Sequence, residues 1–514
     1  MFSSRLLKNI TKDAKTKQNL KIKRSSYSTN ENFLPIFSVA FASAVVFQQA
    51  VRYFVATVLV FSTLSMDTSA GEIQSAAPVY HFEECCAICP QAENPAAYED
   101  GFLKAFKFLK EANNGWLFRT EMDLKTQFGP SPERYAELKR FNDTLKAKGV
   151  QLVLVYLPTR GLMHGDKLTV TQKNNFPLQQ AREQYKNTLR LLRNTGIIVP
   201  DLSLMFAKDH DNFFFKRDHH WTPYGARLTA EIVAEEIKKQ RVYASIPPME
   251  FQTQVSGVLR RIGTHQTAYK KICGYDPGDQ VVDAFTTESS GTEADLFGES
   301  ITEVTLVGTS YSKGAMEYNF AGFLKQNLSV DIDNLAIAGA RYDGALLQYL
   351  PTEDFQKKPP KILIWEVPGL FTLDDELFYR QVNPLVTNGC TGKNVLLEKS
   401  TQLTQSLSGE NTPTEILFNG GGKLLKLNGN NHVIDLQFSD PTVKEIEATV
   451  WYINGRKELI RTKVANRVNN KGRFVFELKR DGEWKNMNFL SLDLARLTSY
   501  SKDLKVKATL CEAE

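Results

Sequence analysis

An acid and a base stand two residues apart in the segment Asp218-His219-His220-Trp221. A carboxylate at this spacing can hydrogen-bond one nitrogen of the imidazole, which fixes the tautomer and leaves the other nitrogen free to act as a base. Such a pair matters for catalysis only if a nucleophile lies elsewhere in the chain. Without one, the segment is a polar helix entry whose histidines are solvated.

Ser310 is the candidate nucleophile. The apolar run Val304–Val307 leads into Gly308-Thr309-Ser310, and a serine directly after a buried strand lies where a parallel-sheet enzyme exposes its nucleophile. The pattern differs from the Gly-x-Ser-x-Gly elbow of α/β-hydrolases, because Ser312 replaces the second glycine. We predict double displacement: His220 takes the proton of Ser310, whose Oγ attacks an acyl carbonyl, and Asp218 stabilises the imidazolium.

Other residues are expected to complete this site. Backbone N–H groups near Ser310 and at Gly339 can hold the oxyanion, and Arg160 and Tyr318 can line the site. The acyl-serine then passes to a hydroxyl group: water as acceptor makes an esterase, and a sugar hydroxyl makes a transferase. We expect no cofactor.

A metal site is the competing interpretation of the same region. The possible ligands are Asp209, His210, Asp211, Asp218, His219 and His220. The chain has only seven histidines, none at the His-x₃-His helical spacing, and ligand clusters without a known spacing are weak signals. The pattern therefore favours serine chemistry without a metal.

Length and composition predict a globular protein of more than one domain. The chain has 514 residues, of which 42% are apolar and 24% charged, so it can form a sizeable core. The net charge of +5 is spread along the chain. Because no basic block outside the N-terminal leader resembles a nucleic-acid footprint, we expect no nucleic-acid partner.

Helices alternate with short apolar strands between residue 114 and about residue 368. Helices are expected at 132–148, at about 178–192 and after Thr222, a good N-cap followed by Pro223. The expected strands are 150–156, 197–199, 304–307, 335–338 and 362–365. Short apolar strands between helices indicate an α/β fold with a parallel sheet covered on both faces. Ligands of such sheets bind at the carboxyl ends of the strands.

After about Cys390 apolar residues recur at every second position, which predicts an antiparallel β-sandwich of about 110–120 residues. Asn454-Gly455 predicts a two-residue hairpin turn. Trp451, Tyr452 and Trp484 can form platforms for sugar rings, although aromatic residues in a sandwich are more often core. Thr449 shares the face of Trp451 by strand alternation.

The leader is predicted to lie outside the fold. A basic stretch, residues 1–30, precedes an apolar region, Phe33–Met66, and Thr68-Ser69-Ala70 is an acceptable cleavage site. We interpret this as an export signal with a long basic extension. A retained membrane anchor and an organellar presequence are the alternatives. The predicted division is a leader at 1–72, an α/β domain at 73–390 and a β-sandwich at 391–514.

The six cysteines are Cys85, Cys86, Cys89, Cys273, Cys390 and Cys511. Only one Cys-x-x-Cys pair occurs, so structural zinc is disfavoured. Long-range bridges suit an exported protein. A Cys390–Cys511 bridge would close the C-terminal unit, and a bridge from Cys273 to one of the N-terminal three would close the first.

The chain resembles the AlgX family of alginate O-acetyltransferases over about residues 75–514. The resemblance rests on an ordered series of stretches: Gly115–Arg119, Pro158–Gly161, Asp218–Ala226, Val307–Ser310, Tyr318–Phe323, Pro360–Glu366, Phe378–Val386, and Trp451-Tyr452 with Asn454–Arg456. It implies an SGNH hydrolase-like domain followed by a carbohydrate-binding module, in a periplasmic protein of alginate biosynthesis.

The resemblance also implies roles for individual residues. Asp218, His220 and Ser310 correspond to a catalytic triad, Tyr318 to the acetylation groove, and Thr449 and Trp451 to a polymer-binding face. The implied bridges are Cys89–Cys273 and Cys390–Cys511. The sequence departs from the family at Glu447, where a basic residue would be expected for holding a polyuronate.

The implied partners are alginate, polymannuronate or a related polyuronate, a membrane O-acyltransferase that donates the acetyl group, and an exopolysaccharide export assembly. Two alternatives use the same residues: an acetylesterase with the same triad, and a polymer-binding scaffold without catalysis. The triad alone does not separate transfer from hydrolysis, so the preference for a transferase rests on the resemblance.

Overall fold

The computed structural model describes residues 89–208, 210, 212–290, 302–313, 317–403, 413–497 and 503–513. All of them belong to one compact unit. The leader expected at residues 1–72 lies outside the described residues, as do Cys85, Cys86, Asp209 and Asp211. Within the described part, no helix combines the length and apolar character that crossing a membrane requires.

Two groups of elements follow each other along the chain. The helices are α1 Thr120–Asp123, α2 Pro132–Ala147, α3 Arg160–His164, α4 Val170–Asn175, α5 Leu178–Asn194, α6 Pro223–Lys238, α7 Thr264–Cys273, α8 Phe320–Leu328, α9 Gly344–Tyr349, α10 Glu353–Lys357 and α11 Glu376–Val386. The strands up to this point are β1 Leu109–Glu111, β2 Leu117–Arg119, β3 Gln151–Leu157, β4 Phe251–Arg261, β5 Gln280–Ser289, β6 Val304–Val307, β7 Asp333–Asn334 and β8 Ile362–Pro368. The later strands are β9 Val395–Gln402, β10 Thr414–Phe418, β11 His432–Phe438, β12 Glu445–Tyr452, β13 Lys457–Lys463, β14 Arg473–Glu477, β15 Phe489–Leu497 and β16 Lys505–Glu512.

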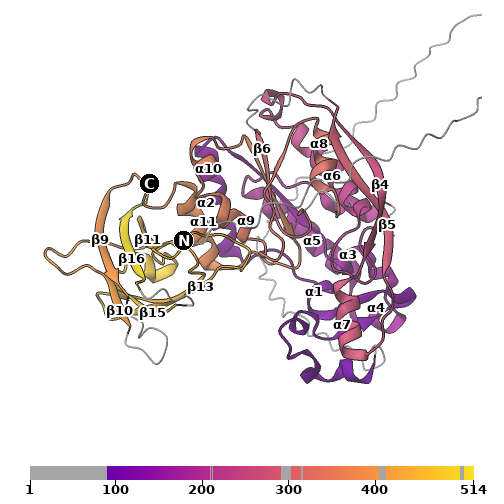
Figure 1. Cartoon of the computed structure of the whole chain (residues 1–514), viewed down its shortest axis with the longest axis horizontal. Coiled ribbons are helices and arrows are strands. Elements are labelled where there is room, and N and C mark those ends of the chain that lie inside the picture. Colours follow the sequence, from indigo (N-terminus) through magenta and orange to yellow (C-terminus); the bar gives the residue numbers. More distant parts are fainter. Residues whose placement is uncertain are drawn as a thin grey trace, which may run out of the picture. The chain divides into compact units, whose positions relative to one another are not determined.

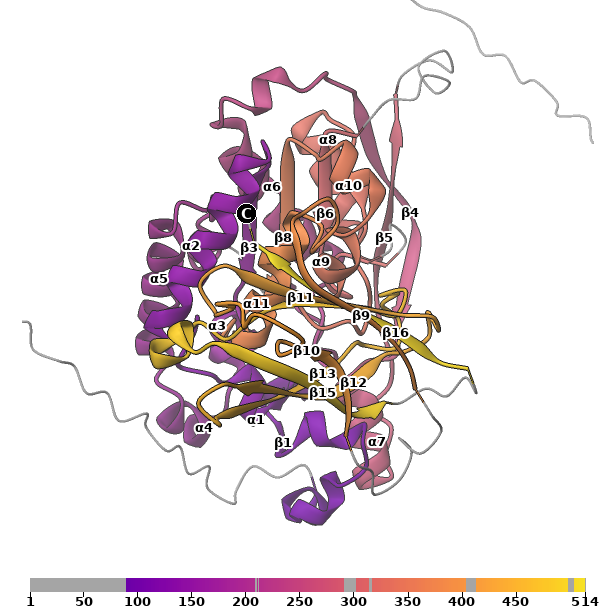
Figure 2. The same ribbon diagram turned by 90° about the vertical axis from the view of Figure 1, so that its left-hand side faces the viewer.

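A parallel sheet with the strand order β3-β8-β6-β7 forms the centre of the first domain. The strands β3, β8 and β6 are mainly apolar and almost wholly buried, because α2, α9 and α11 lie on one side and α5, α6 and α8 on the other (Figure 1). The strands β3, β8 and β6 run side by side (Figure 2). The predicted α/β fold is therefore confirmed.

The helix that follows the Asp218–Trp221 segment begins as predicted. The Thr222 side chain accepts a hydrogen bond from the Gly225 N–H, and Pro223 occupies the first turn of α6. The apolar side of α6 is buried in the core. The buried helix α6 therefore fixes the C-terminal side of the Asp218–Trp221 segment.

Two of the expected strands differ in the structure. Residues 197–199 contribute only an isolated bridge between Ile198 and Val153. The strand expected at 335–338 is displaced, since β7 comprises only Asp333–Asn334. As an edge strand, β7 has one neighbour, and the chain soon turns away through Gly339, whose φ is 75°. Sequence alone placed this strand too late.

The antiparallel hairpin β4–β5 was not predicted. Its strands carry exposed polar and apolar residues on the same face, so no clean alternation marks them. The hairpin packs against α6 and α8. Its first strand, β4, ends at Arg261, and α7 lies in the connection between β4 and β5.

The C-terminal module consists of two four-stranded antiparallel sheets, β10-β15-β12-β13 and β14-β11-β16-β9, which lie face to face (Figure 2). Their inner faces form a second apolar core, so the predicted β-sandwich is confirmed. The hairpin at Asn454-Gly455 has three loop residues rather than two. Tyr452 N–H donates to the Arg456 carbonyl, and Gly455 takes a positive φ of 81°.

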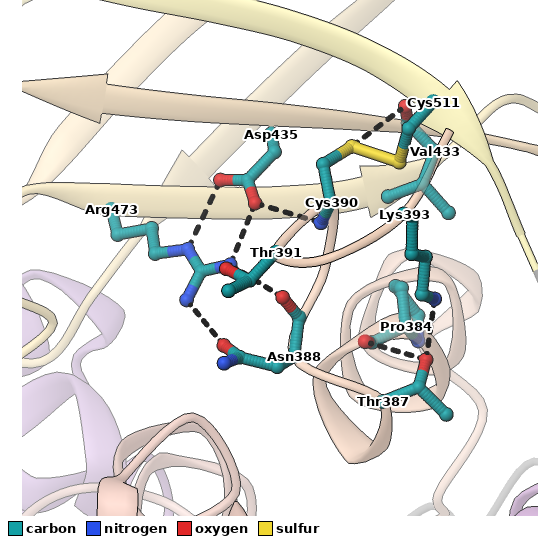
Figure 3. Close-up of a disulfide and its surroundings, with 10 residues drawn as sticks. All are labelled: Pro384, Thr387, Asn388, Cys390, Thr391, Lys393, Val433, Asp435, Arg473 and Cys511. Atoms are coloured by element: carbon teal, nitrogen blue, oxygen red, sulfur yellow. Dashed lines mark hydrogen bonds and ion pairs between the residues drawn. A yellow bond between two sulfur atoms is a disulfide. The ribbon is translucent and has the colours of Figure 1, made fainter. Parts of the chain in front are cut away.

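Both implied disulfides are present. Cys390–Cys511 connects the segment after α11 to β16, and Cys89–Cys273 fastens the C-terminal end of α7. Beside the first bridge, the Arg473 guanidinium contacts Asp435 and Asn388 (Figure 3). This cluster and the packing of α11 on β14 join the module to the first domain.

Candidate active site

Asp218, His220 and Ser310 form a continuous hydrogen-bonded series. Asp218 Oδ1 lies 2.5 Å from His220 Nδ1, and His220 Nε2 lies 2.8 Å from Ser310 Oγ. With Asp218 ionised, Nδ1 carries the hydrogen and donates it to the carboxylate. The unprotonated Nε2 then accepts the hydroxyl hydrogen of Ser310, which is the arrangement that a general base requires.

The two halves of this series come from separate loops of the domain. Ser310 follows β6, whereas Asp218 and His220 lie in a tight loop before α6. An isolated antiparallel bridge between Phe214 and Trp221 closes that loop. The two halves meet across ninety residues of sequence.

Four hydrogen-bonding or charged groups surround the carboxylate of Asp218, which is fully buried. Oδ1 accepts from the N–H and Nδ1 of His220, and Oδ2 accepts from the Thr264 N–H at 2.7 Å. Arg261 Nε lies 3.4 Å from Oδ2. Burial alone raises the pKa of Asp218, but His220, His219 and Arg261 outweigh it and hold the pKa well below its ordinary value.

Sequence reasoning missed Arg261. Its guanidinium lies beside both members of the acid–base pair, with Nη2 3.1 Å from His220 Nδ1. The same group lies over the ring of Tyr318, at 5.7 Å from the ring centroid. No local pattern marked this residue, because it comes from the end of the unpredicted hairpin.

Tyr318 packs on the imidazole of the candidate base. Its ring stacks on His220 with centroids 5.2 Å apart, and the residue is 1% exposed. Among the described residues its hydroxyl has no hydrogen-bond partner. Burial raises the pKa of this hydroxyl, so it remains a neutral donor.

A buried acid, Glu366, holds the turn that carries Ser310. It lies near the carboxyl end of β8, and its carboxyl accepts hydrogen bonds from Thr309 and Ser312. Burial raises the pKa of Glu366 to about 7. The sequence contains Glu366 within a stretch that resembles the family, but nothing in its neighbours indicates a contact with the serine turn.

The loop that leads to Gly339 runs beside the same turn. Leu335 N–H donates to the Leu306 carbonyl at 2.8 Å, and Ile337 N–H donates to the Gly308 carbonyl at 3.1 Å. Gly339 follows two residues later. Its expected part in an oxyanion hole stays a prediction.

Arg160 is buried beside the site, and its expected part in substrate binding stays a prediction. The residue is 1% exposed, and its guanidinium points into the protein. Nη1 donates to the carbonyl oxygens of Phe215 at 2.5 Å and Asp218 at 2.6 Å, and Nη2 donates to the Leu117 carbonyl at 2.8 Å. Arg160 fixes the backbone of the loop that carries Asp218.

The side chains that could hold a metal already have hydrogen-bond partners. Donor atoms of Asp218, His219 and His220 lie within 4.8 Å of one another. However, His219 Nδ1 contacts Thr264 Oγ1 at 2.7 Å, and both nitrogens of His220 belong to the series with Asp218 and Ser310. An ion held by all three residues would have to displace one of the hydrogen bonds of His220.

Comparison with known proteins places the chain in a family. Residues 109–369 match the family model of the SGNH hydrolase-like domain, acetyltransferase AlgX. Residues 389–514 match that of a C-terminal carbohydrate-binding module. The alginate biosynthesis protein AlgX of Pseudomonas fluorescens is 41% identical over 457 residues, which cover 87% of this chain and 92% of that protein. The chain belongs to the AlgX family.

Two further similarities describe the extent of the match. The solved structure of Pseudomonas aeruginosa AlgX superposes with a TM-score of 0.75 and 39% identity, and the match covers 83% of this chain and 99% of that one. The probable alginate O-acetylase AlgJ of Pseudomonas aeruginosa is 32% identical over 283 residues, which cover 50% of this chain and 68% of AlgJ.

In this AlgX-family chain, the module exposes one face of β12. Side chains alternate along the strand, so Thr449 and Trp451 lie on the outer face, whereas Tyr452 is buried in the core. Trp451 Nε1 donates to Asp493 at 2.8 Å, and Lys457 Nζ lies 5.4 Å from the centroid of the Trp451 ring system. The expectation that Tyr452 is a sugar platform is therefore wrong, because its ring faces inward.

The acid at position 447 is neutralised by its neighbour. Glu447 pairs in register with Arg461 on β13, and the two side chains form an ion pair at 2.7 Å. The outer face of β13 also carries Lys457 and Lys463. Lys463 pairs in the same way with Glu445 at 3.0 Å, whereas Lys457 lies over the Trp451 ring.

Proposed function

We propose that this chain is an alginate O-acetyltransferase that works through an acetyl-serine intermediate. The hydrogen-bonded series Asp218–His220–Ser310 is the observation that carries the proposal. His220 accepts the proton of Ser310 while Oγ attacks the acetyl carbonyl of a donor ester. The carbon–oxygen bond to the donor alcohol breaks, and that alcohol leaves with the proton from His220. The acetyl group then remains on Ser310.

The second half of the reaction runs in reverse on a new alcohol. His220 takes the proton of a sugar hydroxyl, whose oxygen attacks the acetyl-serine. Ser310 leaves and regains the proton, and the sugar carries the acetyl ester. Backbone N–H groups near Ser310 and at Gly339 stabilise the oxyanion in both halves. The ring of Tyr318 stacks on His220, which supports a place for Tyr318 beside the acetylation groove.

The proposed acceptor is a mannuronate unit of alginate or a related polyuronate. The names of the AlgX and AlgJ relatives support this choice, and the match to a carbohydrate-binding module supports polysaccharide binding. Within the module, Thr449 and Trp451 would contact the polymer and the cations of β13 would hold its carboxylates.

The remaining parts of the proposal concern the setting of the reaction. We place the protein in the periplasm, with the leader of residues 1–72 as its export signal, the catalytic domain at 73–390 and the module at 391–514. The two disulfides agree with an oxidising compartment. A membrane O-acyltransferase would supply the acetyl group, and the export assembly would present the polymer.

One assay separates the three possible functions. The purified protein is incubated with p-nitrophenyl acetate, with and without oligomannuronate. The masses of the protein and of the sugar are then measured by mass spectrometry. A transferase gives acetylated sugar and an acetyl group on the Ser310 peptide. Acetate as the sole product would establish an esterase instead, and a protein that never becomes acetylated would be a scaffold.

Variants of the same assay test the residues. Ser310→Ala and His220→Ala should abolish acetylation of protein and sugar while polymer binding remains. Ser256→Ala, an exposed serine on β4, is the matched control and should leave activity unchanged. Full activity in either of the first two variants would contradict the proposed roles.

A further inference from the structure

The turn that presents Ser310 rests on one buried carboxyl group. Glu366 is 0% exposed and lies on β8, between β3 and β6. Its Oε2 accepts from the Thr309 N–H at 2.8 Å and from Thr309 Oγ1 at 3.0 Å. The same oxygen lies 3.1 Å from Ser312 Oγ. Glu366 therefore contacts the turn on both sides of Ser310, at Thr309 before it and at Ser312 after it.

The turn also packs directly against this side chain. A Cβ atom on Gly308 would lie 2.6 Å from Glu366 Oε2 and 2.9 Å from Glu366 Cβ, closer than real atoms approach. Any larger residue at position 308 would have to push the turn away from β8. The close packing of the turn on Glu366 therefore requires glycine at position 308.

The hydrogen bonds of Glu366 do not depend on its charge. The Thr309 N–H can only donate, whereas the hydroxyls of Thr309 and Ser312 can donate or accept. A neutral carboxylic acid can therefore accept from the N–H with one oxygen and donate its own O–H to a hydroxyl. The raised pKa of Glu366, about 7, means that both forms occur near neutral pH, and the turn is fastened in each.

We propose that Glu366 is a positioning residue for the nucleophile: its carboxyl group fixes the turn on both sides of Ser310 and so aims Oγ at the acetyl carbonyl. This inference rests on the proposed serine chemistry. A displacement of about 1 Å of a reacting atom can slow a reaction about 100-fold, so the effect belongs in the acetylation rate and not in the affinity for donor or polymer.

The test measures the burst of p-nitrophenol that accompanies acetylation of Ser310. Glu366→Leu should lower the rate constant of acetylation about 100-fold, while the ester concentration that half-saturates this rate constant stays unchanged. Glu366→Gln keeps one acceptor oxygen and gains an NH₂ donor for the hydroxyls, so it should retain activity within about threefold. Thr309→Val should show an intermediate loss that Thr309→Ser restores.

Controls keep the result decisive. Glu477→Gln changes another buried carboxyl, which binds Arg140 at the junction with the module, and should leave the burst unchanged. Each variant is first checked for cooperative thermal unfolding, and Thr309→Val replaces Glu366→Leu if the latter does not fold.

The outcomes separate this inference from the proposed function. A wild-type rate constant of the burst in Glu366→Leu would overturn the positioning role. If Glu366→Leu does not fold, a wild-type rate constant in Thr309→Val would overturn it instead. A Glu366→Gln variant as slow as Glu366→Leu would overturn positioning through hydrogen bonds. Ser310→Ala is measured in parallel: a burst that persists in it would refute the serine mechanism itself, whatever the Glu366 variants do.

Discussion

The carboxylate of Asp218 accepts a hydrogen bond from the backbone N–H of Thr264, the first residue of α7, at 2.7 Å. The N-terminal end of a helix carries partial positive charge and favours an anion. The opposite end of α7 is tied to Cys89 by the disulfide at Cys273. The orientation of the candidate catalytic acid therefore depends on a short helix that is fastened at both ends.

The first prediction concerns the two disulfides. Cys273→Ser should lower the acetylation rate of Ser310 and the free energy of unfolding, the latter by about 2–5 kcal/mol, because α7 is released. Cys390→Ser is the matched variant in the other bridge and should spare acetylation relative to Cys273→Ser. The burst assay and urea unfolding measure both effects. Equal acetylation in the two variants would contradict the role of α7.

Arg261 provides the second prediction. Arg261→Gln should lower the acetylation rate about tenfold or more, because Asp218 would lose its ion pair with the guanidinium and each 1.36 kcal/mol of lost transition-state stabilisation is about tenfold in rate. Arg261→Lys should recover part of the rate, because an ammonium keeps the charge but not the planar geometry. Arg260→Gln, an exposed neighbour on the same strand, serves as the control. Wild-type kinetics in Arg261→Gln would remove Arg261 from the site.

The third prediction is a pH dependence of stability. The pKa of Glu366 is raised from 4.5 to about 7 in the folded protein, so the folded state binds more protons than the unfolded state between these values. The stabilisation that comes from proton binding by Glu366 is fully present below about pH 4.5 and is lost as the pH rises through 7. At 1.36 kcal/mol for each pKa unit, the difference is at most about 3 kcal/mol.

Glu366→Gln removes this titration. The free energy of unfolding of the variant, relative to wild type, should therefore improve by up to about 3 kcal/mol between pH 5 and pH 8. Urea unfolding at the two pH values measures it. Parallel curves for variant and wild type would show that Glu366 has an ordinary pKa.

The fourth prediction concerns the module. Trp451→Ala should weaken binding of polymannuronate about tenfold or more, since truncation of an interface tryptophan commonly costs about 2 kcal/mol or more, and should leave the burst unchanged. Trp484→Ala is the comparison variant, because Trp484 is the other platform candidate and its ring packs edge-on against Tyr452. Calorimetric titration with oligomannuronate compares the two. Equal losses would show that the outer face of β12 is not the binding face.

Much of the candidate site could be predicted because its signals are local. An acid two residues from a histidine before a well-capped helix, and a serine after an apolar run, are visible in short stretches of sequence. A parallel sheet brings the carboxyl ends of its strands to one edge, which accounts for the exposed position of Ser310 after β6. Asp218 and His220 follow no strand of that sheet, so their contact with Ser310 depends on the path of the loop before α6.

The remaining parts depend on directions and distances that the sequence does not encode locally. Arg160 also follows a strand, but its side chain turns inward and donates to four backbone carbonyls. Arg261 and the Thr264 N–H reach Asp218 only because the β4–β5 hairpin folds over α6 and α8. Glu366 looks like one polar residue within an apolar strand until β6 is placed beside it.

The position of β8 between β3 and β6 has a consequence for the order in which the protein can be made. Ser310 is synthesised well before residues 362–368, yet β6 pairs with β8 on one side and only the short β7 on the other. A growing or translocating chain that has passed Ser310 but not β8 lacks both the central strand and the Glu366 contact. The module also depends on a strand that is made late, because β16 pairs with both β11 and β9 and is the last strand along the described chain. Under the proposed mechanism, acetylation of Ser310 should therefore begin only after β8 has been synthesised and has paired with β6.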